Sequence, residues 1–153
     1  MNARELLDAL EKQHAAQYGW VFIRELRLGT GYSHLSDQRV DAWAINCWKL
    51  QRFGAPYMRR AFEIKVSAAD VRKELLDPDK RWVAYAISNE FWFCTPPGLI
   101  DPRLLAKDDG LQEFDGNNWK IIKPPRQREG MPPRWSFVAG LARRLTRGVE
   151  GID

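Results

Sequence analysis

The chain has 153 residues, of which 44% are hydrophobic and 12% aromatic. This length suits one domain with its own core, and the apolar content excludes an intrinsically disordered segment. No run approaches the roughly 18 apolar residues of a membrane span, and the first residues lack the apolar stretch of a signal peptide. We therefore expect a cytoplasmic protein without a membrane partner.

The first half of the chain is expected to contain one helix and three strands. Asn2 predicts the N-cap of a first helix, which ends near Tyr18-Gly19. Strands are predicted at 20–28, 39–48 and 60–66, because apolar residues alternate with or flank the charges in these runs. Residues 29–37 form a glycine-containing loop that we expect to lie beside a ligand.

Helices and strands also alternate in the second half. Ser67 predicts the N-cap of a helix that Pro78 breaks, and Asp70 occupies the acidic position of a capping box. The other expected elements are a helical segment, a strand, a helical turn, a hairpin and a final helix, at 80–86, 90–94, 102–105, 110–122 and 135–147. We predict a domain over 1–123, and a basic connector and C-terminal helix over 124–153 that pack on it or extend it.

Basic residues are concentrated toward the end of this chain, whose net charge is +4. Such a segment indicates binding to a polyanion, although a solvated basic helix explains the charge equally well. The basic residues of this segment are Lys120, Lys123, Arg126, Arg128, Arg134, Arg143, Arg144 and Arg147.

Two cysteines, Cys47 and Cys94, lie in apolar, strand-like runs. We expect both to be small buried thiols, with a disulfide or a metal pair as the alternative. His14 has no metal-site spacing with either cysteine.

The most informative residues are Asp41 on the second predicted strand and the triplet Glu63-Ile64-Lys65 on the third. Positions 63 and 65 point to the same face of a strand, so two carboxylates and an amine can converge. Divalent-metal phosphodiester hydrolysis needs this set, because carboxylates hold a hard cation while a lysine stabilises charge on the phosphate or orients the attacking water. The alternative is a solvated sheet face, where Glu-x-Lys is common.

The order helix, three strands with Asp and then Glu-x-Lys, helix, strand resembles that of the PD-(D/E)xK, or restriction-endonuclease-like, nucleases. Within this superfamily the chain is most similar to the MmcB-type DNA repair nucleases. The resemblance implies an α/β fold with an αβββαβ core, in which helices flank a mixed central sheet in a single domain. It rests on Arg39-Val40-Asp41-Ala42, Phe62-Glu63-Ile64-Lys65-Val66-Ser67, Arg81-Trp82-Val83-Ala84-Tyr85, Phe91-Trp92-Phe93 and Gly110-Leu111-Gln112-Glu113-Phe114-Asp115.

This resemblance also implies roles for individual residues. Asp41 and Glu63 would be ligands of Mg²⁺ or Mn²⁺ together with the carbonyl of Ile64, and Lys65 would be the catalytic lysine. Many members of the superfamily add another acid from an early element. Glu25 is our first choice for that catalytic acid, although an exposed charge on an alternating strand explains it equally well. The alternatives on the first helix are Glu11 and Glu5.

Four residues are predicted to contact nucleic acid. Two of them match helix positions that assist phosphate or water placement in branches of the superfamily, and two are basic residues of the preceding helix. The four are Arg81, Tyr85, Arg72 and Lys73. Contacts to phosphates carry no sequence information, so the expected action is structure-selective.

The sequence therefore predicts a metal-dependent nuclease that hydrolyses DNA and, by family resemblance, acts in DNA repair. Two alternatives remain open: a non-catalytic DNA- or RNA-binding module, and a regulatory subunit that keeps the fold as a scaffold. The paired acids argue against a pure binding module, because carboxylates beside phosphates weaken affinity through repulsion. One site cuts one strand, so double-strand cleavage would need a homodimer or sequential nicks.

Overall fold

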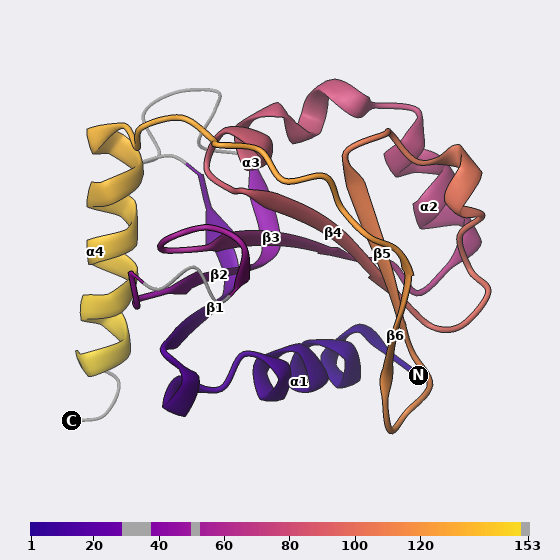
Figure 1. Cartoon of the computed structure of the whole chain (residues 1–153), viewed down its shortest axis with the longest axis horizontal. Helices are drawn as coiled ribbons and strands as arrows, with labels where there is room; N and C mark the ends of the chain where they lie inside the picture. The colour runs from indigo at the N-terminus through magenta and orange to yellow at the C-terminus, as the bar shows by residue number, and fades with distance from the viewer. Residues whose placement is uncertain (29–37, 50–52, 151–153) are drawn as a thin grey trace.

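A computed structural model describes residues 1–28, 38–49 and 53–150. Its centre is a six-stranded mixed sheet, flanked by helices in a single α/β domain (Figure 1). This confirms the predicted α/β class, with a mixed sheet between helices. The loop at 29–37, which we expected beside a ligand, lies outside the described residues.

The strands follow one another across the sheet in chain order. The first three strands are antiparallel, the third to the fifth run parallel to one another, and the last returns antiparallel. Consequently the carboxyl ends of the third, fourth and fifth strands lie at one end of the sheet. The end of the first strand and the start of the second lie at the same end. The strands are β1 (Trp20–Arg27), β2 (Arg39–Asn46), β3 (Arg59–Ile64), β4 (Glu90–Thr95), β5 (Asp109–Phe114) and β6 (Trp119–Lys123).

Two predicted helix caps are present in the structure. The Glu5 amide donates to Asn2 Oδ1 at 3.0 Å and the Asn2 amide to Glu5 Oε2 at 3.2 Å, which completes a capping box. The Asp70 amide donates to Ser67 Oγ at 3.2 Å at the second cap. The helices are α1 (Ala3–Gln13), α2 (Ala68–Leu75), α3 (Trp82–Ala86) and α4 (Trp135–Glu150), with 3₁₀ turns η1 (Ala16–Tyr18), η4 (Pro78–Arg81) and η5 (Pro102–Leu104).

The first helix is shorter than predicted. It ends at Gln13, and η1 fills the interval before β1. The His14 amide donates to the carbonyls of both Leu10 and Glu11, so the last turn tightens there. None of the helices in the described part of the chain is long and apolar enough to cross a bilayer.

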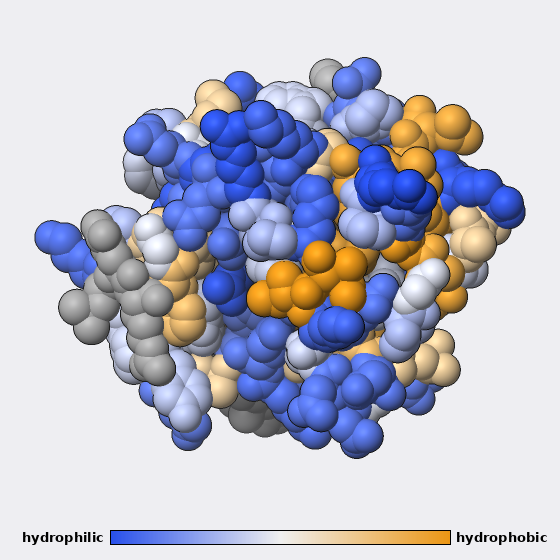
Figure 2. Space-filling model, turned by 45° about the vertical axis from the view of Figure 1, so that its right-hand side comes forward, coloured by the Kyte–Doolittle hydropathy of each residue, from blue (hydrophilic) through white to orange (hydrophobic). Residues whose placement is uncertain are grey.

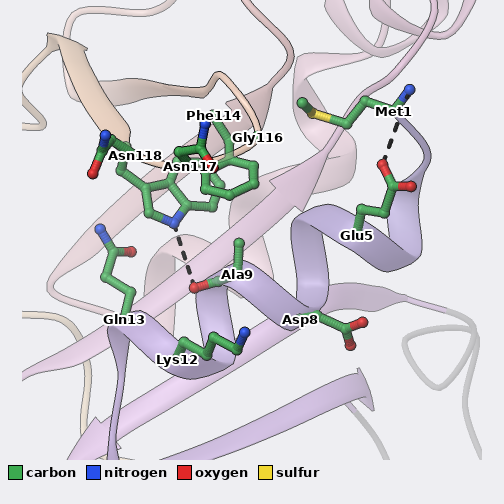
Figure 3. Close-up of a pocket in the computed structure, with 11 residues that line it drawn as sticks. Met1, Glu5, Asp8, Ala9, Lys12, Gln13, Phe114, Gly116, Asn117 and Asn118 are labelled. Atoms are coloured by element: carbon green, nitrogen blue, oxygen red, sulfur yellow. Dashed lines mark hydrogen bonds and ion pairs between the residues drawn. The ribbon is translucent and has the colours of Figure 1, made fainter.

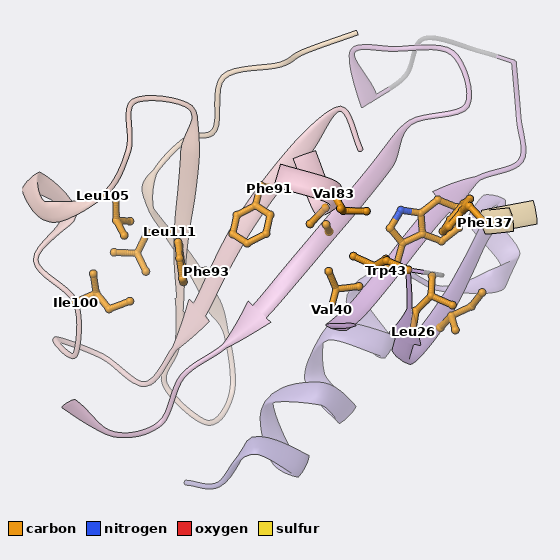
Figure 4. Close-up of a cluster of buried hydrophobic side chains, with 14 of the residues drawn as sticks. Leu26, Val40, Trp43, Val83, Phe91, Phe93, Ile100, Leu105, Leu111 and Phe137 are labelled. Carbon is orange, nitrogen blue, oxygen red and sulfur yellow. The ribbon is translucent and has the colours of Figure 1, made fainter. Parts of the chain in front are cut away.

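Each face of the sheet has its own core. Leu6 and Leu10 of α1 pack on one face with Phe62. On the opposite face, α2, α3 and α4 contribute to a cluster that includes Trp43 and Phe137 (Figure 4). The rings of this last pair meet edge to face with centroids 5.5 Å apart, so α4 is anchored on β2.

The segment between β6 and α4 is bound to the rest of the domain. The amide of Arg128 donates to the carbonyl of Asn89 at 2.9 Å, and that of Met131 to the carbonyl of Ala86 at 2.8 Å. These bonds run from the connector to the junction between α3 and β4. The connector is therefore packed on the domain rather than projecting from it.

The surface is mainly hydrophilic, with apolar side chains gathered in local patches on the face in Figure 2. Cys94 is buried as predicted, but Cys47 is exposed. The prediction for Cys47 is wrong because β2 ends at Asn46 and places residue 47 beyond the sheet.

Candidate active site

Strands β2 and β3 separate at the predicted site. Their pairing is continuous up to Ala42 opposite Phe62, and the next residues along the two strands are Asp41 and Glu63. The Asp41 side chain bridges the two strands where they separate, because its Oδ2 accepts a hydrogen bond from the Ile64 amide at 2.7 Å. Two acids from different strands therefore lie together at one edge of the sheet.

Lys65 completes this group and also contacts an acid from the next helix. Its Nζ lies 3.6 Å from Glu63 Oε2 and 3.2 Å from Glu74 Oε1. The side chains of Glu63 and Glu74 are only 9% and 1% exposed, against 15% for Lys65. The lysine is thus held between two buried carboxylates and retains limited access to solvent.

Glu74 is a site residue that the sequence analysis did not identify. It lies three residues after the buried Val71 on α2, so helical spacing places both on the face toward the sheet. This helical spacing was the sequence signal from which the burial of Glu74 could have been predicted. A glutamate near the end of an eight-residue helix is usually solvated, which hid it.

A chain of polar contacts continues from Glu74. Arg81 Nη1 donates to the Glu74 carbonyl at 3.0 Å and to its Oε2 at 3.2 Å. Arg81 Nε donates to the Tyr85 hydroxyl at 3.4 Å, and this hydroxyl donates to Asp109 Oδ1 at 2.7 Å. The contacts link α2, α3 and β5 behind Lys65.

The position of Arg81 bears on its predicted role. The residue is 5% exposed and its guanidinium is engaged with Glu74 and Tyr85. It therefore supports the candidate site from behind rather than presenting a free cation to a phosphate. Arg72 and Lys73 on α2 are exposed, as a contact with nucleic acid requires.

The surroundings of Glu63 strongly perturb this carboxyl group. Burial, and then the charges of Asp41 and Glu74, raise the pKa of Glu63 to about 9. For Lys65, burial acts to lower the pKa, but the charges of Glu63 and Glu74 outweigh it and hold the pKa above its ordinary value. A protonated Glu63 beside a cationic Lys65 is therefore favoured at neutral pH.

The donor set fits a small hard cation. Asp41, Glu63 and the carbonyl of Ile64 offer oxygen ligands, and Mg²⁺ takes one or two protein carboxylates and keeps several waters. Asp41 Oδ2 accepts a hydrogen bond from the Ile64 amide, and the Asp41 and Glu63 side chains are also hydrogen-bonded to each other. The pKa of Glu63 is raised by burial and by the charges of Asp41 and Glu74 despite the nearby Lys65, so a bound cation would offset this repulsion. Within 1–28, 38–49 and 53–150, no group of three or more His, Cys, Asp or Glu side chains is arranged around one point, so backbone and water oxygens would complete the coordination.

Glu25, the predicted additional acid, lies on β1 with a left-handed φ of 49°. This backbone conformation breaks the in–out alternation of side chains along β1. Ile23 and Leu26, which are three residues apart, pack in the same core cluster instead of on opposite faces. Its side chain is exposed, and it lies across from Asp41, between the pairs Arg24–Ala42 and Leu26–Val40. No hydrogen bond or ion pair among the described residues joins Glu25 to Asp41, and a site role for Glu25 stays a prediction.

The two alternative acids on α1 also lie elsewhere. Glu11 accepts from Arg24 at 2.8 Å. Glu5 lines a hollow of about 670 Å³ between α1 and the β5–β6 hairpin, together with Lys12 and Trp119 (Figure 3). Asp41, Glu63 and Lys65 are absent from its lining, so this hollow is separate from the candidate site.

Comparison with known proteins gives a fold-level relationship. No family model and no curated protein matches the chain. Among solved structures, the chain is similar to the SPO1766 protein of unknown function from Silicibacter pomeroyi, with 20% sequence identity and a TM-score of 0.60. The match covers 99% of this chain and 95% of that one. At this level of identity the likeness shows a shared fold, and function has to be argued from the site.

Proposed function

We propose that the protein is a Mg²⁺- or Mn²⁺-dependent nuclease that hydrolyses DNA phosphodiester bonds with structure-selective action. The observation that carries the proposal is the meeting of Asp41, Glu63 and Lys65 where β2 and β3 separate. The buried Glu63 and the partly buried Asp41 would destabilise the fold as a purely structural feature, because like charges in a poorly solvated site repel. A role in DNA repair rests on the family resemblance alone.

Each residue of the group has a distinct task in this proposal. Asp41 and Glu63 would hold the cation with the Ile64 carbonyl, and the cation when bound would polarise the phosphate and acidify a water. Lys65 would stabilise negative charge on the phosphate or orient the attacking water. Glu74 would keep Lys65 in place, since it forms the shorter of the two ion pairs of that lysine.

The exposed basic side chains of α2 are suited to binding phosphates on either side of the cleaved bond. Arg72 and Lys73 follow the β3–α2 junction that begins directly after Lys65. Contacts to the sugar–phosphate backbone position a substrate without reading its sequence, so they favour selection by structure. Such contacts also make binding weaken steeply with added salt.

The test is cleavage of labelled single-stranded, duplex and flap DNA with Mg²⁺ or Mn²⁺. Asp41→Asn and Lys65→Ala should each reduce cleavage at least about 100-fold while remaining folded, in the range known for loss of a transition-state contact. Lys107→Ala removes an exposed lysine at the opposite edge of the sheet and should leave the rate unchanged. Salt-sensitive DNA binding without metal-dependent cleavage would instead support a non-catalytic nucleic-acid-binding module or a regulatory subunit.

A further inference from the structure

Two arginines face each other across β1 and β2. Arg27 at the end of β1 is paired directly with Arg39 at the start of β2. Side chains of directly opposed residues lie on the same face, with Cβ atoms roughly 5 Å apart, and like charges in this arrangement repel. Both side chains are exposed. Such a pair costs stability unless an anion lies close to both guanidinium groups.

No acid among the residues that the structure describes forms an ion pair with Arg27 or Arg39. By contrast, Arg24 on β1 binds two acids, Asp8 at 2.7 Å and Glu11 at 2.8 Å. Arg60 on β3 binds Glu90 at 2.9 Å. Among the described residues, Arg24 and Arg60 therefore have acidic partners, whereas Arg27 and Arg39 have none.

The arginine pair adjoins the candidate active site. Arg39 precedes Asp41 by two residues on β2, so the two residues are about 6.6 Å apart along the strand. The end of β1, the start of β2 and the end of β3 lie at the same end of the sheet. Leu26, Leu28 and Val40 beside the pair pack in the core cluster on the α2, α3 and α4 face, so the two arginines point to the opposite face from Glu63 and Lys65.

We infer that Arg27 and Arg39 form a phosphate-binding subsite, which holds the nucleic-acid backbone at the end of the sheet that carries Asp41 and Glu63. Two planar guanidinium groups offer several N–H donors to the oxygens of one phosphate, and the bound charge relieves their repulsion. The subsite deepens the proposed nuclease function and rests on it for its substrate. Both arginines are exposed, so an extended nucleic-acid strand can reach them.

Binding can be measured without cleavage. Fluorescence anisotropy with a labelled single-stranded oligonucleotide, in EDTA and over a salt series, should show about five-fold weaker binding for Arg27→Gln and for Arg39→Gln. Each substitution should also lower the slope of log affinity against log salt by about 0.7 to 0.9, the value for one lost phosphate contact. Lys107→Gln removes an exposed positive charge at the opposite end of the sheet and should change neither quantity.

Thermal unfolding provides an independent readout. In low salt without phosphate or other multivalent anions, Arg39→Gln should raise the melting temperature by about 1–3 °C, because it removes the repulsion with Arg27. A merely structural arginine would lower it. Stabilisation of the wild type by the oligonucleotide should fall in Arg39→Gln.

Three results would overturn the inference. The first is unchanged DNA affinity in both variants, and the second is an equal loss of affinity in Lys107→Gln. The third is variants that still bind DNA but are no longer stabilised by inorganic pyrophosphate or by anionic phospholipid vesicles. The last result would assign the pair to free phosphates or lipid headgroups. Absence of cleavage by the wild type would contradict the nuclease proposal, while the binding comparison would still decide the role of this pair.

Discussion

Lys65 Nζ lies closer to Glu74 Oε1, at 3.2 Å, than to Glu63 Oε2, at 3.6 Å. The lysine of the candidate site is therefore held by the helix that follows it as well as by its own strand. Arg81 fixes Glu74 from the other side through its Oε2 and its main-chain carbonyl. Lys80 Nζ also lies 3.9 Å from Glu74 Oε1, so Glu74 is shared among three cations, of which Lys65 and Arg81 are the closest.

We expect Glu74→Gln to lower the free energy of unfolding by about 3 kcal/mol, because it leaves two buried cations poorly compensated. Urea denaturation at pH 7 measures this change. Glu11→Gln is the matched control, since Glu11 is 55% exposed in its pair with Arg24 and such pairs contribute less than about 1 kcal/mol. Equal effects of the two substitutions would show that the Glu74 cluster does not stabilise the fold.

The order of elements was predictable because its signals are local. Caps at Asn2 and Ser67, and the alternation around Asp41 and Glu63, depend on residues within one turn or one strand. The same alternation placed Glu63 and Lys65 on one face, and the structure joins them by an ion pair.

The unpredicted parts of the site arise from tertiary contacts. Glu74 and Arg81 are charged residues, for which exposure is the usual expectation, and only the packing of η4 against α2 buries them together. The opposition of Arg27 and Arg39 depends on the register of β1 and β2, which the sequence pattern alone does not specify. The left-handed backbone at Glu25 likewise has no local signal, because glycine or asparagine is the usual residue there.

Glu63 should make the metal-free protein less stable as the pH rises. Its pKa is about 9 in the folded protein against an ordinary value of 4.5, so the folded state keeps a proton that the unfolded state releases. This contribution is present in full below pH 4.5 and is lost progressively toward pH 9, by up to about 1.4 kcal/mol per pH unit. Urea denaturation in EDTA from pH 5 to 8 should show this slope in the wild type relative to Glu63→Gln. Parallel profiles for the two proteins would exclude the raised pKa.

A divalent cation should reverse this loss. Binding at Asp41 and Glu63 requires the Glu63 proton to leave, so Mn²⁺ should stabilise the protein more at pH 8 than at pH 6. At a concentration about 100 times the dissociation constant, the gain is about 2.7 kcal/mol. Thermal unfolding with Mn²⁺ should show the shift in the wild type and in Asp79→Asn, which alters an exposed acid on η4, but not in Asp41→Asn. A shift that survives in Asp41→Asn would place the cation elsewhere.

The opposite face of the sheet should respond to acid in the reverse sense, through His14. Its Nδ1 lies 2.9 Å from the Leu10 carbonyl and its Nε2 3.0 Å from Arg60 Nη1, so the neutral ring donates at Nδ1 and accepts from Arg60 at Nε2. Burial, with a smaller contribution from the charge of Arg60, lowers the pKa of His14 to about 4. Its contribution to stability is present above pH 6.5 and is lost as the pH falls toward 4.

Glu63 and His14 therefore impose opposite slopes that overlap between about pH 4.5 and 6.5, where their contributions to the metal-free protein should nearly cancel. Replacing either residue should expose the slope of the other. In His14→Phe the loss of stability with rising pH should begin near pH 4.5, whereas in Glu63→Gln stability should increase up to about pH 6.5. Denaturation of both variants over pH 4.5 to 8 measures this, and two variants with the same slope in the overlap would show that one of the two groups titrates normally.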